Sequence, residues 1–212
     1  SAIDNAGLIQ LNASGSDPAL IINGAIDLVG GGAIHMLGPT FDNFILGVPG
    51  SSATLINIDN VIAGSGNIGD GDHNLSFINE ATVDATPILP GDSGLLIIDT
   101  GNAVANGGVF EATGGGELLV GDLLVNSGLV QAVGAGSSVA FDRSQVYNGY
   151  SGVIEAEGWW SSVAFDRSHV RNGGSIEAAW GGLVSFEASH IRNGWSGVIT
   201  ADGRGSEVTF DD

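Results

Sequence analysis

Carboxylates recur beside arginines at regular intervals in the second half of the sequence. Asp142 precedes Arg143 and Asp166 precedes Arg167, and the later acids Glu187 and Asp211 stand where the repeat brings them. Two carboxylates at a defined separation can hydrolyse a glycosidic bond. A catalytic centre, however, needs one unusual constellation rather than the same residue in every repeat. We therefore interpret these residues as charges that neutralise each other on a solvated face, and we predict no catalytic residue.

A glycine-rich acidic turn, GDGDHNLSF at 69–77, is the candidate metal site. Asp70, Asp72 and Asn74 alternate as hard oxygen donors, which suits Ca²⁺. The turn occurs once, and Leu75 stands where an EF-hand loop has glycine. The alternative interpretation is an acidic turn between two strands, and apart from Ca²⁺ the sequence predicts no cofactor.

Aromatic side chains form a third candidate site, for a glycan or a partner protein. They fall in the segments between predicted strands: Tyr150, Trp159, Trp160, Trp180 and Trp195. Aromatic faces can stack on sugar rings, and they can equally pack on one another or on another chain. His169 and His190 lie at equivalent repeat positions, as does Gln145, and we interpret them as a surface stack rather than a metal pair.

An internal repeat determines where most of these candidate residues lie in the chain. SSVAFDRSQV at 137–146 returns as SSVAFDRSHV at 161–170, an offset of 24 residues. Five units begin at asparagines spaced 20, 22, 24 and 21 residues apart: Asn106, Asn126, Asn148, Asn172 and Asn193. A second column of the repeat consists of Phe141, Phe165, Phe186 and Phe210. Stacked asparagine amides can bond to each other across coils, and glycines are expected to supply the other corners, where φ is positive. Another column of glycines precedes the first strand of each unit: Gly108, Gly128, Gly152, Gly174 and Gly197.

A period of this length with like residues stacking predicts an all-β fold, a right-handed parallel β-helix. We expect one domain over 1–212 with about nine or ten coils of 20–24 residues. Residues 106–212 form five regular coils. Residues 1–105 form less regular coils with loop insertions, and the proline-bearing segments 38–53 and 86–94 are expected to loop out of the stack.

The charge balance excludes two classes of partner. The chain has 24 acidic residues against five arginines, no lysine and a net charge of −19. Nucleic acid and anionic lipid both require cationic neutralisation, so neither is expected. A run without charge, 123–141, is broken by polar residues and glycines, so no membrane insertion is predicted.

Several stretches resemble a family of bacterial proteins. LINIDNVIAGSGNIGDGDHNLSFINEATVDA, GGVFEATGGGELLV and the SGVIEA-type coils are similar to secreted repeat exoproteins of Gram-negative bacteria, which include autotransporter passengers and filamentous-haemagglutinin-like adhesins. The resemblance implies a secreted or cell-surface location and a role as a structural or adhesive stalk that contacts host or matrix glycans. The sequence ends within a strand pattern, so we expect a segment of a longer protein. Two alternatives stay open: a carbohydrate-active β-helix enzyme or glycan-binding module, and a fibre unit in which copies join end to end.

Overall fold

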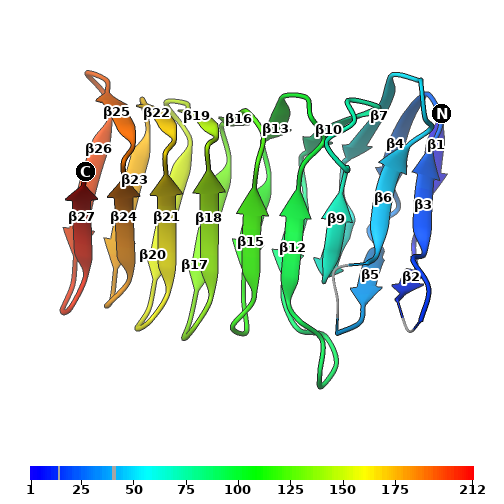
Figure 1. Ribbon diagram of the computed structural model, residues 1–212, viewed down its shortest axis with the longest axis horizontal. Coiled ribbons are helices and arrows are strands. Elements are labelled where there is room, and N and C mark those ends of the chain that lie inside the picture. Colours follow the sequence, from blue (N-terminus) through cyan, green and yellow to red (C-terminus); the bar gives the residue numbers. More distant parts are fainter. Residues whose placement is uncertain (14, 40–41) are drawn as a thin grey trace.

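The strands of the chain form three sheets, each made of parallel strands, and the three sheets together form a β-helix (Figure 1). The computed structural model describes residues 1–13, 15–39 and 42–212. Each sheet has nine strands, and the chain visits the three sheets in turn, so it makes about nine coils. The predicted all-β parallel β-helix is confirmed, while its right-handed sense stays a prediction. No helix occurs in the described ranges, and accordingly none there could span a membrane.

Sheet A is formed by the first strand of each coil. Its strands are β1 (Ala2–Asp4), β4 (Ala25–Val29), β7 (Ala53–Asn57), β10 (Leu75–Asn79), β13 (Val104–Asn106), β16 (Leu124–Asn126), β19 (Gln145–Asn148), β22 (His169–Asn172) and β25 (His190–Asn193).

Sheet B is formed by the second strand of each coil. Its strands are β2 (Leu8–Asn12), β5 (Ala33–Leu37), β8 (Val61–Gly64), β11 (Thr82–Ala85), β14 (Val109–Ala112), β17 (Leu129–Val133), β20 (Val153–Glu157), β23 (Ser175–Ala179) and β26 (Val198–Asp202).

Sheet C is formed by the third strand of each coil. Its strands are β3 (Ala19–Ile22), β6 (Phe44–Gly47), β9 (Gly66–Ile68), β12 (Leu95–Ile98), β15 (Glu117–Val120), β18 (Ser138–Asp142), β21 (Ser162–Asp166), β24 (Leu183–Glu187) and β27 (Glu207–Asp211).

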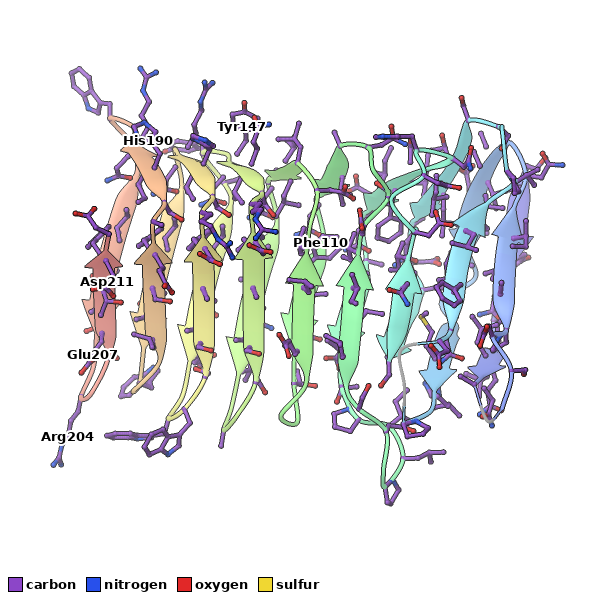
Figure 2. All side chains as sticks on the ribbon, in the orientation of Figure 1. Phe110, Tyr147, His190, Arg204, Glu207 and Asp211 are labelled. Carbon is purple, nitrogen blue, oxygen red and sulfur yellow. The ribbon has the colours of Figure 1, made fainter. Side chains whose placement is uncertain are left out.

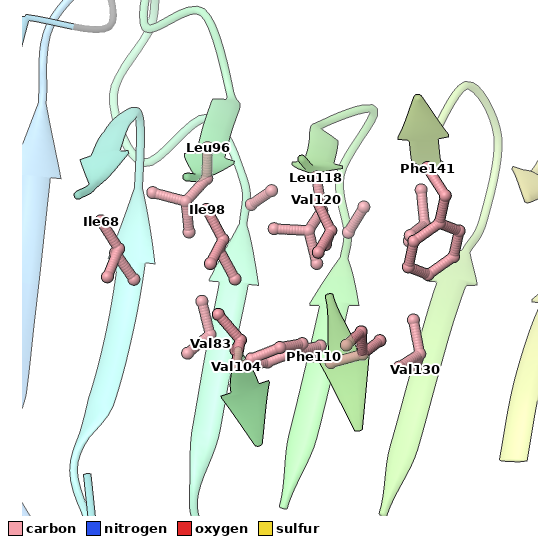
Figure 3. Close-up of a cluster of buried hydrophobic side chains, with 14 of the residues drawn as sticks. Ile68, Val83, Leu96, Ile98, Val104, Phe110, Leu118, Val120, Val130 and Phe141 are labelled. Atoms are coloured by element: carbon pink, nitrogen blue, oxygen red, sulfur yellow. The ribbon is translucent and has the colours of Figure 1, made fainter. Parts of the chain in front are cut away.

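Alternation along each strand separates the core from the surface. In β21, Val163 and Phe165 are buried and Ala164 between them points outward, because successive side chains of a strand face opposite sides. The buried side chains of successive coils meet in one continuous core, in which Phe110 lies close to Val83 and Val130 (Figure 3).

The phenylalanine column of sheet C stacks ring on ring. Centroids of successive rings are 4.8, 4.8 and 5.0 Å apart, with planes within 9° of parallel, from Phe141 through Phe165 and Phe186 to Phe210. These separations match the strand spacing of about 4.8 Å. Each ring therefore packs on the ring of the next coil without displacing the backbone.

The asparagine column lies at the corner between sheets A and B, and it is longer than the sequence indicated. Each Nδ2 donates to the Oδ1 of the next coil at 2.8–2.9 Å, and two further members, Asn57 and Asn79, precede Asn106. The spacing from Asn79 to Asn106 is 27 residues because the segment 86–94 lengthens that coil. Because this spacing is longer than the 20–24 residues of the later coils, the repeat in the sequence did not reveal Asn57 and Asn79 as members of the column.

Glycines of the repeat serve two purposes. At the corners between sheets B and C, glycines such as Gly134 and Gly158 have the expected positive φ. Gly108, Gly128 and their equivalents do not have positive φ. A Cβ on residue 128 would instead lie 2.2 Å from the carbonyl oxygen of Gly108, and one on residue 174 would lie 2.1 Å from that of Gly152. Close approach of successive backbones is therefore what requires glycine in this column.

The two predicted insertions differ in the structure. Segment 86–94 connects β11 to β12 as a protruding loop (Figure 1). Segment 38–53 was expected to leave the stack as well, but it contains β6, which pairs with β3 and β9 in sheet C. Prolines at both ends of the segment masked this short strand, and residues 40 and 41 lie outside the described ranges.

Candidate functional site

Three of the five predicted aromatic residues lie together at the corner between sheets B and C. Trp159 and Trp160 connect β20 to β21, and Trp180 connects β23 to β24. Their exposed fractions are 56, 80 and 66%, so this tryptophan corner presents indole surface to solvent.

Tight turns hold the tryptophan corner in place. Trp160 and Trp180 have φ of 69° and 53°, in the left-handed region that side chains other than glycine rarely adopt. A backbone bond from Ser161 N–H to the oxygen of Gly158 closes the first turn at 3.2 Å, and one from Gly182 to Ala179 closes the second at 3.0 Å. The backbone therefore directs these side chains outward instead of into the core.

Glycines allow the ring of Trp159 to lie across the following coils. A Cβ on residue 181 would come within 2.8 Å of the Trp159 ring, and so would one on residue 205. Because both positions are glycine, the ring of Trp159 contacts the backbone of the next two coils. One indole thus covers a strip of the corner parallel to the helix axis.

A shallow hollow of about 300 Å³ opens beside the tryptophan corner. Trp159, Trp160 and Leu183 supply apolar surface, while Ser162 and Glu207 supply a hydroxyl and a carboxylate. An aromatic face bordered by hydrogen-bonding groups is the chemistry that a sugar ring requires, because its C–H faces are apolar and its edge is polar.

The other two aromatic residues lie at a different corner. Tyr150 follows β19 and Trp195 follows β25, both between sheets A and B, and both are exposed. The five aromatic residues therefore do not form one platform. The sequence placed them all in corner segments, but it could not distinguish one corner of the coil from another.

The acidic turn at 70–74 is held by its own hydrogen bonds. Asp72 accepts the backbone N–H of Asn74 at 2.8 Å, and the Asn74 amide also donates to this carboxylate. The Oδ1 of Asn74 accepts the N–H of Gly50 at 2.9 Å. Both polar atoms of the Asn74 side chain thus have protein partners.

The two carboxylates of this turn influence each other. Burial, followed by a hydrogen bond and repulsion from Asp72, raises the pKa of Asp70 above its usual value. The Asn74 backbone N–H is the main cause that lowers the pKa of Asp72. Within the described ranges no group of three or more His, Cys, Asp or Glu is placed to hold a metal. The Ca²⁺ site at Asp70, Asp72 and Asn74 stays a prediction.

The acid and arginine columns of the sequence form ion pairs on the surface. Arg167 contacts both Asp142 (3.2 Å) and Asp166, and Arg143 lies 3.6 Å from Asp142. The Arg167 guanidinium holds the pKa of Asp166 below its usual value. These side chains are largely exposed, so their pairing balances charge and adds little stability.

The outer face of sheet A carries residues that the sequence analysis missed. His169 and His190 lie in register on adjacent coils, with ring centroids 5.9 Å apart and planes tilted by 57°. Two positions further along the same strands lies a second outward column of Tyr147, Arg171 and Arg192. Alternation along a strand was the signal that could have found this column, because residues two apart share a face.

Comparisons of the sequence with protein-family models, with curated proteins and with solved structures found no significant match. Identity therefore rests on the fold, and the chain is a repeat protein of the parallel β-helix class.

Proposed function

We propose that this chain is a non-enzymatic structural and adhesive segment of a secreted or cell-surface bacterial protein, and that it holds a host or matrix glycan at the tryptophan corner. The observation that carries the proposal is the exposed indole surface of Trp159 and Trp160, which line a hollow of about 300 Å³. Exposed indoles next to hydroxyl and carboxylate groups are typical of sugar-binding surfaces.

The architecture supports a stalk-like role. Nine coils joined by three continuous parallel sheets give a stiff body, and eight strand spacings of about 4.8 Å make it roughly 40 Å long. Each coil contacts mainly its neighbours, so such a body can be lengthened by adding coils without a new core. Surfaces repeated along a stiff body allow several weak contacts to act together. The resemblance to bacterial exoproteins of adhesive function agrees with this role.

A glycan-array screen tests the adhesive part of the proposal. We expect the wild-type chain to bind a defined set of uncharged glycans and the variant Trp159→Ala to lose about tenfold in affinity for them, equivalent to ~1.4 kcal/mol. Trp195→Ala is the matched control, because it removes an exposed tryptophan at the other corner. Binding that is unchanged in Trp159→Ala, or the absence of any bound glycan, would contradict the proposal.

A second candidate function is end-to-end assembly into a fibre. Successive coils pair in register through parallel strands, as β21 does with β24, so coils of two copies could pair in the same way. Unpaired strand edges are templates for further strands. Sedimentation measured over a hundredfold range of concentration separates the candidates, since a fibre unit grows in mass and a stalk segment does not.

A further inference from the structure

The outer face of sheet A carries two columns of polar side chains over three successive coils. One column runs through Gln145, His169 and His190, and the other runs through Tyr147, Arg171 and Arg192. Their strands are adjacent and parallel, so the side chains form a grid with rungs about 4.8 Å apart. Tyr147 and His190 both project from this side of the molecule (Figure 2).

The arginines of this grid differ from those at the neighbouring corner. Arg143 and Arg167 form ion pairs with carboxylates. Arg171 lies with its guanidinium carbon 5.1 Å from the centre of the Tyr147 ring, and no ion pair of Arg171 or Arg192 with a carboxylate occurs in the described part of the chain. Their charges are therefore available to a ligand.

A hollow of about 400 Å³ lies over the grid. It is lined by Gln145, Tyr147, His169, Val170, Arg171, His190 and Arg192, and none of these is acidic. We name this hollow the cationic groove. Sheet B contrasts with it, since its outward column includes the acids Asp84, Glu111, Glu155 and Glu177. On a chain with a net charge of −19, the cationic groove is a local exception.

We propose that the cationic groove binds a sulfate or carboxylate group of an acidic glycan. Arginine presents a planar fork of N–H donors that matches such oxyanions, and two arginines on adjacent coils offer two forks side by side. The amide of Gln145 and the hydroxyl of Tyr147 can form hydrogen bonds with sugar hydroxyls in the same hollow.

An extended glycan suits this groove better than a nucleic acid. The two columns continue over three coils, which matches a chain molecule rather than a small ion. Nucleic acid carries a charge about every 1.7 Å of duplex and depends on several cationic contacts. The remaining acidic surface would repel so dense a charge, whereas an acidic glycan has charges separated by neutral ring surface.

The groove is independent of the tryptophan corner. It lies on sheet A, while the tryptophan corner joins sheets B and C, and Arg204 of that corner projects from the side opposite His190 (Figure 2). Binding in the groove therefore does not require binding at the tryptophan corner, and each site can be removed without the other.

Titration with labelled oligosaccharides tests the proposal. The probes are a sulfated dextran oligosaccharide, an oligogalacturonate of similar length and a neutral dextran oligosaccharide, each followed by fluorescence anisotropy at low salt. We expect the wild-type chain to bind at least one acidic probe, and the double variant Arg171→Gln/Arg192→Gln to lose at least tenfold in affinity. Trp159→Ala is expected to retain this binding, which separates the groove from the function proposed above.

Arg143→Gln/Arg167→Gln is the matched control, since it also removes two positive charges, but from arginines that already have carboxylate partners. The control variant is expected to lose threefold or less in affinity for the acidic probe. Circular dichroism checks that both double variants fold. Binding of the sulfated probe alone would assign sulfate to the groove, and binding of the galacturonate alone would assign carboxylate. No binding of either probe, equal binding of the neutral probe, or equal losses in both double variants would overturn the proposal.

Discussion

Buried asparagine amides connect each coil to the next at the corner between sheets A and B. Asn126 donates to the Oδ1 of Asn148 and accepts from the Nδ2 of Asn106, both at 2.8 Å, and it is fully buried. Its Nδ2 also lies 3.2 Å from the carbonyl oxygens of Gly128 and Val153. At the scale of a residue, each amide thus satisfies polar groups on three coils.

Asn126→Ala should lower the free energy of unfolding by about 3 kcal/mol, because it leaves buried donors and acceptors without partners. Asn193→Ala removes an asparagine from the exposed last coil and should cost about 1 kcal/mol. Urea denaturation of both variants measures the difference. Equal costs would mean that the asparagine column does not stabilise the interior coils.

Asp84 makes the stability depend on pH. Burial, with a smaller contribution from Glu111, raises its pKa from 3.8 to about 6, although the Thr113 hydroxyl donates to it at 2.9 Å. The native state therefore binds this proton more tightly than the unfolded state does. Its contribution to the free energy of unfolding is greatest below pH 4 and is lost as pH rises through about 6.

Asp84→Asn should therefore stabilise the protein by about 1 kcal/mol at pH 7, after allowance for solvent screening, and should have little effect at pH 4. The asparagine keeps an oxygen that can accept from Thr113. Asp17→Asn, at an exposed position, is the control. Thermal unfolding between pH 4 and pH 7 checks the prediction, and parallel pH profiles of wild type and Asp84→Asn would contradict it.

At the scale of elements, glycines determine how closely successive coils approach. Gly128→Ala should cost about 3 kcal/mol or prevent folding, because its Cβ would lie 2.2 Å from the Gly108 oxygen. A Cβ on residue 7 has no atom within 4 Å, so Gly7→Ala should change the free energy of unfolding by about 0.5 kcal/mol or less. Melting temperatures of the two variants provide the comparison, and a Gly128→Ala protein as stable as Gly7→Ala would refute the close-approach explanation.

The repeat of the sequence predicted the strands well and the sites only in part. The burial of Val163 and Phe165 could be predicted, because alternation along a strand determines which side chains face the core. Asn79 escaped because an insertion broke the period, and β6 escaped because prolines flank it. The division of the aromatic residues between two corners depends on where each strand ends, and the cationic groove depends on the register of neighbouring strands. Like residues at a constant spacing show which positions of successive coils lie side by side. They do not show which different columns lie on the same surface of the folded chain.

At the scale of the whole molecule, stability should be greatest in the middle of the stack. Each coil contacts chiefly its neighbours, and the side chains of β25, β26 and β27 are more exposed than those of the interior strands. Hydrogen–deuterium exchange should therefore be slowest in β12–β21 and at least a hundredfold faster in β25–β27. Uniform protection from one end to the other would show instead that the nine coils unfold as one cooperative unit.

A non-enzymatic adhesive segment retains its glycan without cleaving it, and incubation with the glycan distinguishes retention from turnover. The glycan bound most tightly on the array is incubated with the purified chain for a day, with and without 2 mM Ca²⁺, and is then recovered and analysed by mass spectrometry. We predict that the glycan is recovered intact under both conditions. Shortened or unsaturated oligosaccharides, formed by the wild-type chain and absent from a buffer control, would contradict it and would identify a carbohydrate-active β-helix enzyme.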